Sequence, residues 1–140
     1  RGQGLVYAYY VHPTLISTSG DTLLPIGSPI TGGTTVSIFG SNFRASGDGI
    51  RVRFQDASGN LTALSGRATF VSSEQIRVVT PPFPAPADLV RVSVSLNGGQ
   101  DFSGQAADVF QYYAQPIFNN IIPHLGPRLG ETPIMLNGTG

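Results

Sequence analysis

Several residue types are missing or scarce in this 140-residue chain, and each absence excludes a class of protein. There is no cysteine, which excludes a disulfide scaffold and a cysteine-based metal site. All 8 basic residues are arginines, and the formal net charge is zero. Charged residues make up only 11% of the chain, so we expect neither a nucleic-acid partner nor electrostatic docking on a membrane, because both need a concentrated basic surface.

Long apolar runs are also absent. No segment approaches the roughly 20 apolar residues of a membrane span, so direct membrane insertion by this segment is not expected. Hydrophobic residues nevertheless make up 40% of the chain, and the 18 glycines and 11 prolines fall between short alternating runs. This pattern is typical of a turn-rich all-β domain. Few charges and many hydroxyl side chains favour an extracellular or cell-surface location.

Residues 50–54 and 89–97 show the clearest alternation, with apolar side chains on one face and polar ones on the other. Asn97-Gly98-Gly99 predicts a hairpin turn, and residues 81–86, rich in proline, predict a connector between two sheets. Roughly seven such strands with frequent turns predict a two-sheet sandwich. The outward positions of the predicted strands carry Arg51, Arg53, Arg77 and Arg91. They either keep a sheet face soluble or form a ladder for an acidic partner.

The chain repeats itself. The sequence YYVHP at residues 9–13 recurs as YYAQP at 112–116, and the pattern at 29–40 recurs at 127–138. The two offsets are about 103 and about 98 residues, which is the size of a domain. We therefore expect a terminal strand of a preceding unit at 1–11, a complete unit at 12–114, and the opening strands of a following unit at 115–140.

The motifs of the complete unit resemble the IPT/TIG domain family. Its opening pattern is matched by Pro13, Ile16, Pro25, Gly27-Ser28-Pro29, Gly32-Gly33-Thr34, Val36, Ile38, Gly40 and Phe43. Its later pattern is matched by Val52, Phe54, Ser72-Ser73-Glu74-Gln75-Ile76, Thr80-Pro81-Pro82, Val90, Val92, Val94, Asn97-Gly98, Phe110 and Tyr112. The resemblance implies an immunoglobulin-like β-sandwich. It implies little about function, because this fold hosts many roles.

The residues where successive units would meet are the candidate functional residues. The inter-domain junction is predicted to consist of Tyr9, Tyr10, His12, Pro13, Tyr113, Gln115 and Pro116. Tyrosine is suited to such a boundary, because its ring adds buried area while its hydroxyl stays solvated. Two glycosylation sequons are also present, Asn60-Leu61-Thr62 and Asn137-Gly138-Thr139, so Asn60 and Asn137 are candidate N-glycosylation sites.

No group of residues predicts catalysis or a cofactor. The two histidines, His12 and His124, stand beside prolines without a nucleophile or carboxylate at motif spacing. The acidic residues are scattered through predicted loops, whereas a calcium site needs several converging oxygens. We expect a protein that is not an enzyme and that has no cofactor, no metal and no catalytic residues.

These observations favour a non-enzymatic structural or adhesive repeat of an extracellular or cell-surface protein, built as a rod or filament. Its expected partners are neighbouring copies of the same domain, in tandem or head-to-tail, and glycans are a further candidate. One alternative is a ligand-binding receptor ectodomain, which predicts an apolar or arginine-lined patch on one sheet. Another is a carbohydrate-binding accessory domain of a secreted enzyme, which predicts exposed aromatic rings, with Tyr7, Phe39, Phe70 and Phe83 as candidates.

Overall fold

The computed structural model describes residues 11–16, 21–46, 49–106, 108–122, 128, 130–131 and 133–140. The elements found in these ranges are strands, and no helix occurs there, so none is long and apolar enough to cross a membrane. Tyr7, Tyr9, Tyr10 and His124 lie outside the described residues, as does the predicted terminal strand at 1–11 apart from Val11.

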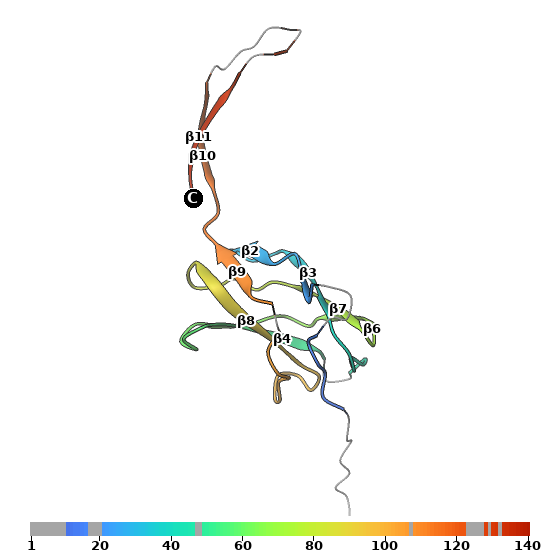
Figure 1. Ribbon diagram of the computed structural model, residues 1–140. Coiled ribbons are helices and arrows are strands. Elements are labelled where there is room, and N and C mark those ends of the chain that lie inside the picture. The colour runs from blue at the N-terminus through green and yellow to red at the C-terminus, as the bar shows by residue number, and fades with distance from the viewer. Residues whose placement is uncertain are drawn as a thin grey trace, which may run out of the picture.

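The described strands form three sheets (Figure 1). A four-stranded sheet has the order β1-β3-β7-β6, and a five-stranded sheet has the order β2-β9-β8-β4-β5. A separate two-stranded sheet pairs β10 with β11. The strands are β1 (Leu23–Leu24), β2 (Gly27–Pro29), β3 (Thr35–Phe39), β4 (Arg51–Asp56), β5 (Thr62–Leu64), β6 (Thr69–Ser72), β7 (Gln75–Val79), β8 (Ala87–Ser95), β9 (Phe110–Tyr113), β10 (Ile117–Ile122) and β11 (Met135–Thr139).

The inner face of the five-stranded sheet follows from the alternation of its strands. Val52 of β4 pairs with Val94 of β8, and Phe54 pairs with Val92, which brings four apolar side chains to the same face. All four are fully buried. A shift of one residue in this register would turn every one of them outward, so the core fixes the pairing.

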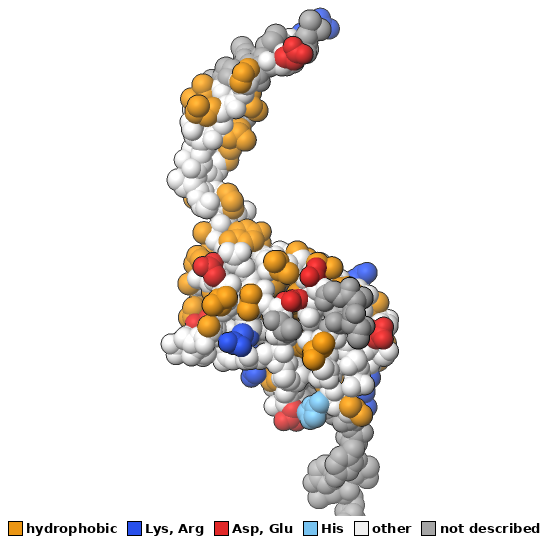
Figure 2. All heavy atoms as spheres, in the orientation of Figure 1, with side chains coloured by type: hydrophobic (Ala, Val, Ile, Leu, Met, Phe, Trp, Pro, Cys, Tyr) orange, Lys and Arg blue, Asp and Glu red, His pale blue; other side chains and the backbone are white. Residues whose placement is uncertain are grey.

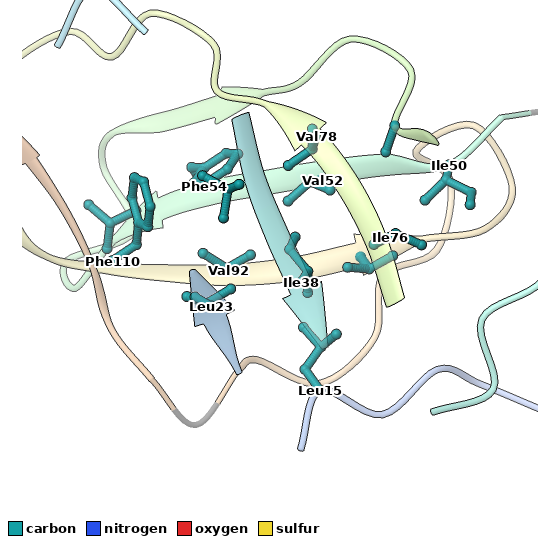
Figure 3. Close-up of a cluster of buried hydrophobic side chains, with 14 of the residues drawn as sticks. Leu15, Leu23, Ile38, Ile50, Val52, Phe54, Ile76, Val78, Val92 and Phe110 are labelled. Carbon is teal, nitrogen blue, oxygen red and sulfur yellow. The ribbon is translucent and has the colours of Figure 1, made fainter. Parts of the chain in front are cut away.

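The four-stranded sheet packs its own apolar face against this layer (Figure 3). Val36 pairs with Val78 and Ile38 pairs with Ile76, across β3 and β7. The buried core also includes Leu15, Leu23, Phe43, Ile50, Ala68, Phe83, Val90, Leu96, Phe110 and Tyr112. The two-sheet sandwich predicted from alternation is therefore confirmed.

The turn predicted at Asn97–Gly99 is present, but the prediction of a short hairpin there is wrong. The next strand, β9, begins only at Phe110. Between them the chain stays beside β8, because the amides of Ser103 and Ala106 donate to the carbonyl oxygens of Val94 and Val92 at 2.7 and 2.8 Å. The hydroxyl of Ser103 also accepts a hydrogen bond from the amide of Val94. These bonds keep residues 103–106 beside β8, on the edge with which β9 pairs further along.

The proline-rich connector crosses from β7 in one sheet to β8 in the other, as predicted. Phe83 within it is buried and stacks on Tyr112, with 4.5 Å between the ring centroids. The expectation that Phe83 is an exposed aromatic is therefore wrong. The connector is anchored because its apolar residues fill the space between the sheets.

The β10–β11 hairpin projects from the sandwich beyond β9 (Figure 1). Its strands pair with each other and belong to neither larger sheet. Apolar side chains, drawn in orange, lie along its surface in Figure 2. The most exposed of them are Ile117, Phe118, Ile134, Met135 and Leu136, each about 60% exposed.

Candidate functional site

The predicted junction after the central unit is a three-residue linker. β9 ends at Tyr113 and β10 begins at Ile117, so only Ala114, Gln115 and Pro116 separate them. The carbonyl oxygen of Tyr113 accepts a hydrogen bond from the amide of Ile30 at 2.9 Å, which fixes the end of β9 to the chain beyond β2. The linker can span at most about 14 Å, so it permits little separation between the two parts.

A cluster of hydroxyl groups joins the two sheets close to this linker. Ser28 of β2 is fully buried, and its Oγ lies 2.9 Å from Oγ1 of Thr80 and donates to Oγ1 of Thr34 at 3.0 Å. The amide of Thr34 donates to Oγ1 of Thr80 at 3.0 Å. Because buried polar groups are costly when unpaired, this set of bonds fixes how the β2 edge meets the opposite sheet.

Tyr112 completes this end of the sandwich. Its hydroxyl donates to the carbonyl oxygen of Pro81 at 3.0 Å, while its ring contacts Phe54, Phe83 and Phe110. Burial raises the pKa of this phenol, and the hydrogen bond with Thr80 acts in the opposite direction. Tyr113, its neighbour, faces outward and is 42% exposed. Of the two adjacent tyrosines, Tyr113, the predicted junction residue, is therefore the one that faces solvent.

The start of the central unit has a comparable construction. Pro13 is buried, while His12 is exposed. Thr14 and Ser41 exchange two backbone hydrogen bonds of 3.1 and 2.9 Å. The side-chain amide of Asn42 donates to the carbonyl oxygen of His12 at 3.3 Å. These contacts tie the incoming chain to the segment after β3.

The same backbone arrangement recurs at the hairpin. Ile117 pairs with Thr139, which stands 98 positions after Ser41. A Cβ atom at Gly40 would clash with the carbonyl oxygen of Thr14, and one at Gly138 would clash with that of Ile117. The repeat seen in the sequence is therefore also a repeat of strand pairing and of a close backbone approach.

Backbone dihedral angles repeat at the same spacing. Gly32, Gly33 and Asn42 have φ values of 73, 89 and 64°. The residues 98 positions later are Gly130, Glu131 and Gly140, with φ values of 81, 61 and 115°. Glutamate rarely adopts a positive φ, because the left-handed conformation costs roughly 1–2 kcal/mol for a residue with a Cβ atom. Glu131 therefore adopts the left-handed conformation that Gly33 adopts in the central unit, although it has a Cβ atom.

The equivalent side chains differ in burial. Val36 and Ile38 are fully buried, whereas Ile134 and Leu136, which stand at the repeated positions, are both 61% exposed. An open hollow of about 350 Å³ beside Leu136 is lined by residues from both hairpin strands and by Pro116. Gln115 and Pro116 are themselves exposed. The hairpin thus repeats these backbone features of the central unit without the corresponding buried side chains.

Both sequon asparagines are accessible. Asn60 is exposed in the turn between β4 and β5, where its backbone amide donates to Oγ of Ser58 at 3.2 Å. Thr62, the third sequon residue, is also exposed. Asn137 is exposed on β11 and pairs with Asn120 of β10. In both places the asparagine side chain has solvent around it.

The four arginines do not form one ladder. Arg77 lies on β7 in the four-stranded sheet, whereas Arg51, Arg53 and Arg91 lie on β4 and β8 of the five-stranded sheet. That part of the prediction is wrong, because outward alternation does not say to which sheet a strand belongs. The three remaining arginines lie on neighbouring strands, Arg51 and Arg53 two residues apart on β4 and Arg91 on β8. Within the described residues, no three histidine, aspartate or glutamate side chains converge as a metal site would require.

Two features were missed by reasoning from the sequence. One is the hydroxyl cluster, since Ser28, Thr34 and Thr80 give no local signal. The other is Phe102, whose ring lies 4.2 Å from the guanidinium carbon of Arg53. An aromatic residue soon after a Gly-Gly turn was the available signal, but its contact depends on the path of the whole loop.

Two packed β-sheets, one of which ends in a parallel pair between β2 and β9, define the central part as an immunoglobulin-like sandwich module. The family model of the IPT/TIG domain matches residues 13–112, and the chain belongs to this family, as its motifs predicted. A solved structure of the plexin A4 full extracellular region, domains 1 to 10, is similar at 28% sequence identity and a TM-score of 0.52. The match covers 84% of this chain and 9% of the plexin chain.

Proposed function

We propose that this chain is a non-enzymatic structural module of an extracellular or cell-surface protein, and that it works in a tandem array of similar modules. The observation that carries the proposal is the repeated backbone: the strand pairing, the close glycine approach and the positive φ values all recur, at an offset of 103 positions from Thr14 to Ile117 and of 98 positions from Ser41 to Thr139. A second module of the same kind that begins at Gln115 accounts for all of them. Its partner is then the neighbouring copy of the same domain.

The exposure of the hairpin supports the same conclusion. A two-stranded sheet is marginally stable in water by itself. Ile134 and Leu136 stand where the central unit buries Val36 and Ile38, so the remaining strands of a second sandwich would cover them. The short linker and its contacts at Tyr113 would then set the spacing between modules. An array of this kind forms a rod whose length depends on the number of modules.

The extracellular location rests on two observations. The similar plexin structure is described as an extracellular region of ten domains. The chain itself is low in charge and rich in hydroxyl side chains. Both agree with a cell-surface module and with N-linked glycans at Asn60 and Asn137. Peptide mass spectrometry of native material tests the glycans, and an unmodified Asn60 peptide would contradict the first of them.

The array is tested by electron microscopy of the native protein. We expect rows of globular modules with a regular spacing, and isolated single globules would overturn the proposal.

A designed chimera tests the equivalence of the two units. Because Gly140 stands where Asn42 stands in the first unit, residues 43–114 are appended directly after Gly140. The appended strands should complete a second sandwich, which appears as a second cooperative unfolding transition and as slow hydrogen exchange in β11. A matched control carries the same appended residues in scrambled order, which removes the alternation of the strands and should abolish both signals. Rapid exchange in β11 of both chimeras would contradict the equivalence.

A further inference from the structure

We propose that the outer face of the five-stranded sheet binds an acidic polysaccharide through Arg51, Arg53 and Arg91. This site is separate from the junction and from the tandem arrangement. Alternation along β4 turns Arg51 and Arg53 to the outer face. Arg53 pairs with Ser93 of β8, and Arg91 is the next outward residue of that strand. In Figure 2, basic side chains lie over the part of the molecule where Figure 1 places β8 and β4.

The three guanidinium groups are held in position by neutral partners. Nη1 of Arg51 donates to the carbonyl oxygen of Ser65 at 3.0 Å, and Nη1 of Arg91 donates to Oε1 of Gln105 at 3.1 Å. The guanidinium of Arg53 lies over the ring of Phe102. A basic side chain that serves only solubility is normally free to move in water. Each of these three has a described contact in the absence of a ligand.

The loop that carries Phe102 is itself well anchored. Oγ of the buried Ser95 accepts a hydrogen bond from the amide of Gly99 at 2.9 Å and donates to Oδ1 of Asn97 at 2.8 Å. The side-chain amide of Asn97 donates to Oδ2 of Asp101 at 2.9 Å. Asp101 is therefore bonded within the loop, and Phe102 has a fixed position against Arg53.

None of the three arginines has a described carboxylate partner, and Arg51 and Arg53 are also partly buried. Their described partners are a carbonyl oxygen, an amide oxygen and an aromatic ring, and none is a carboxylate. The Nε atoms of Arg51 and Arg53 are buried without an acceptor. Partial burial of a charged group is costly unless an opposite charge is near. An anion bound at these guanidinium groups would supply that charge.

The chemistry of the face points to a sugar polymer that carries anionic groups. The guanidinium fork binds carboxylate and sulfate groups through two parallel hydrogen bonds. Arg51 and Arg53 are two residues apart on one strand, about 6.6 Å, so they suit separate anionic groups along a chain. Around them stand Gln55 and Thr62, whose side chains can bond sugar hydroxyls.

The test is a binding titration of the 140-residue chain, with NMR or calorimetry as the readout. The probes are a polygalacturonate oligosaccharide, which carries carboxylates, and a heparin-derived hexasaccharide, which carries sulfates. Neutral dextran and poly-glutamate are the comparison probes. We expect at least one acidic oligosaccharide to bind, with affinity that falls as salt rises, and we expect the shifted resonances to lie on β4 and β8.

Variants locate the site. The double variant Arg53→Gln/Arg91→Gln should weaken binding at least tenfold, whereas Arg77→Gln, an outward arginine of the other sheet, should leave it unchanged. Arg53→Lys keeps the charge but loses the fork, so it should bind with intermediate affinity. Equal weakening by Arg77→Gln, binding of dextran, or no binding of either acidic oligosaccharide overturns the proposal. Tighter binding of poly-glutamate than of both oligosaccharides would replace the sugar by an acidic peptide and overturn it as well.

Discussion

The central sandwich and the β10–β11 hairpin share a backbone but not an environment. Gly40 and Gly138 approach a neighbouring carbonyl in the same way, and positive φ values recur at matching positions. Yet Ile38 is fully buried and Leu136 is mostly exposed. The comparison separates what a local segment specifies for itself, namely pairing and turn conformation, from what only the assembled unit provides, namely a core. Four predictions test this separation, from the largest expected effect to the smallest.

The largest difference is expected between Ile38→Ala and Leu136→Ala. The first should lower the free energy of unfolding by about 2–5 kcal/mol, because it removes buried methyl groups and leaves a cavity. The second should change it by less than about 0.5 kcal/mol, because its side chain is exposed. Urea denaturation of both variants measures the difference. Similar losses would mean that the hairpin packs on the sandwich in solution.

The two glycines provide the next test. Gly40→Ala should destabilise the sandwich by about 1–3 kcal/mol, since the new methyl group meets the backbone at Thr14 and not a movable side chain. Gly138→Ala should disturb only the hairpin, and should appear as faster hydrogen exchange in β10 and β11 with the main transition unchanged. An unchanged hairpin would show that the close approach at Ile117 is not needed for pairing.

Tyr112→Phe should cost about 0.5–1.5 kcal/mol through the lost hydrogen bond to Pro81. The variant should also change the response to alkaline pH. Burial raises the pKa of Tyr112 above the ordinary tyrosine value of 10.0, so the unfolded chain releases this proton first. The contribution of Tyr112 to the free energy of unfolding is fully present below about pH 10 and declines as the pH rises above this value. Denaturation at several pH values should show a shallower alkaline decline in Tyr112→Phe than in the wild type.

The smallest effect is expected for Arg91→Ala. Its side chain is exposed and its described hydrogen bond is made to Gln105, so the change should be less than about 0.5 kcal/mol. Val92→Ala, one residue further along the same strand, should cost roughly 1–3 kcal/mol. A thermal melt of the two variants checks the inward and outward assignment of β8. Equal losses would show that the assignment is shifted by one residue.

Much of the sandwich could be predicted because its signals are local. Alternation alone places Val52, Phe54 and Val92 in the core, and the proline and glycine motifs are sufficient to identify the family. The first two strands were missed. β1 and β2 are only two and three residues long and flank Pro25, so neither shows alternation. Their positions are set by pairing with β3 and β9, and β9 in particular is distant in the sequence.

The arrangement of arginines on the outer face of the five-stranded sheet was predictable only in part. Outward positions on β4 and β8 follow from periodicity, but the grouping of Arg51, Arg53 and Arg91 depends on which strands are neighbours. Arg53 is partly buried and lies against Phe102, whose position depends on the path of the loop after β8, while Arg91 stays exposed. That path follows from hydrogen bonds at Ser95 and Ser103, two residues that look like ordinary surface serines in the sequence.

The parallel pairing of β2 with β9 has a consequence for a chain under tension. β2 lies near the start of the central unit and β9 at its end, so pulling the two termini apart slides these strands along each other. The bonds from Gln111 to Ile26 and from Ile30 to Tyr113 lie at opposite ends of the pair, and both are loaded at once. Antiparallel strands pulled from one end separate bond by bond. Here the load is shared in shear, so this edge of the module resists extension as a single unit.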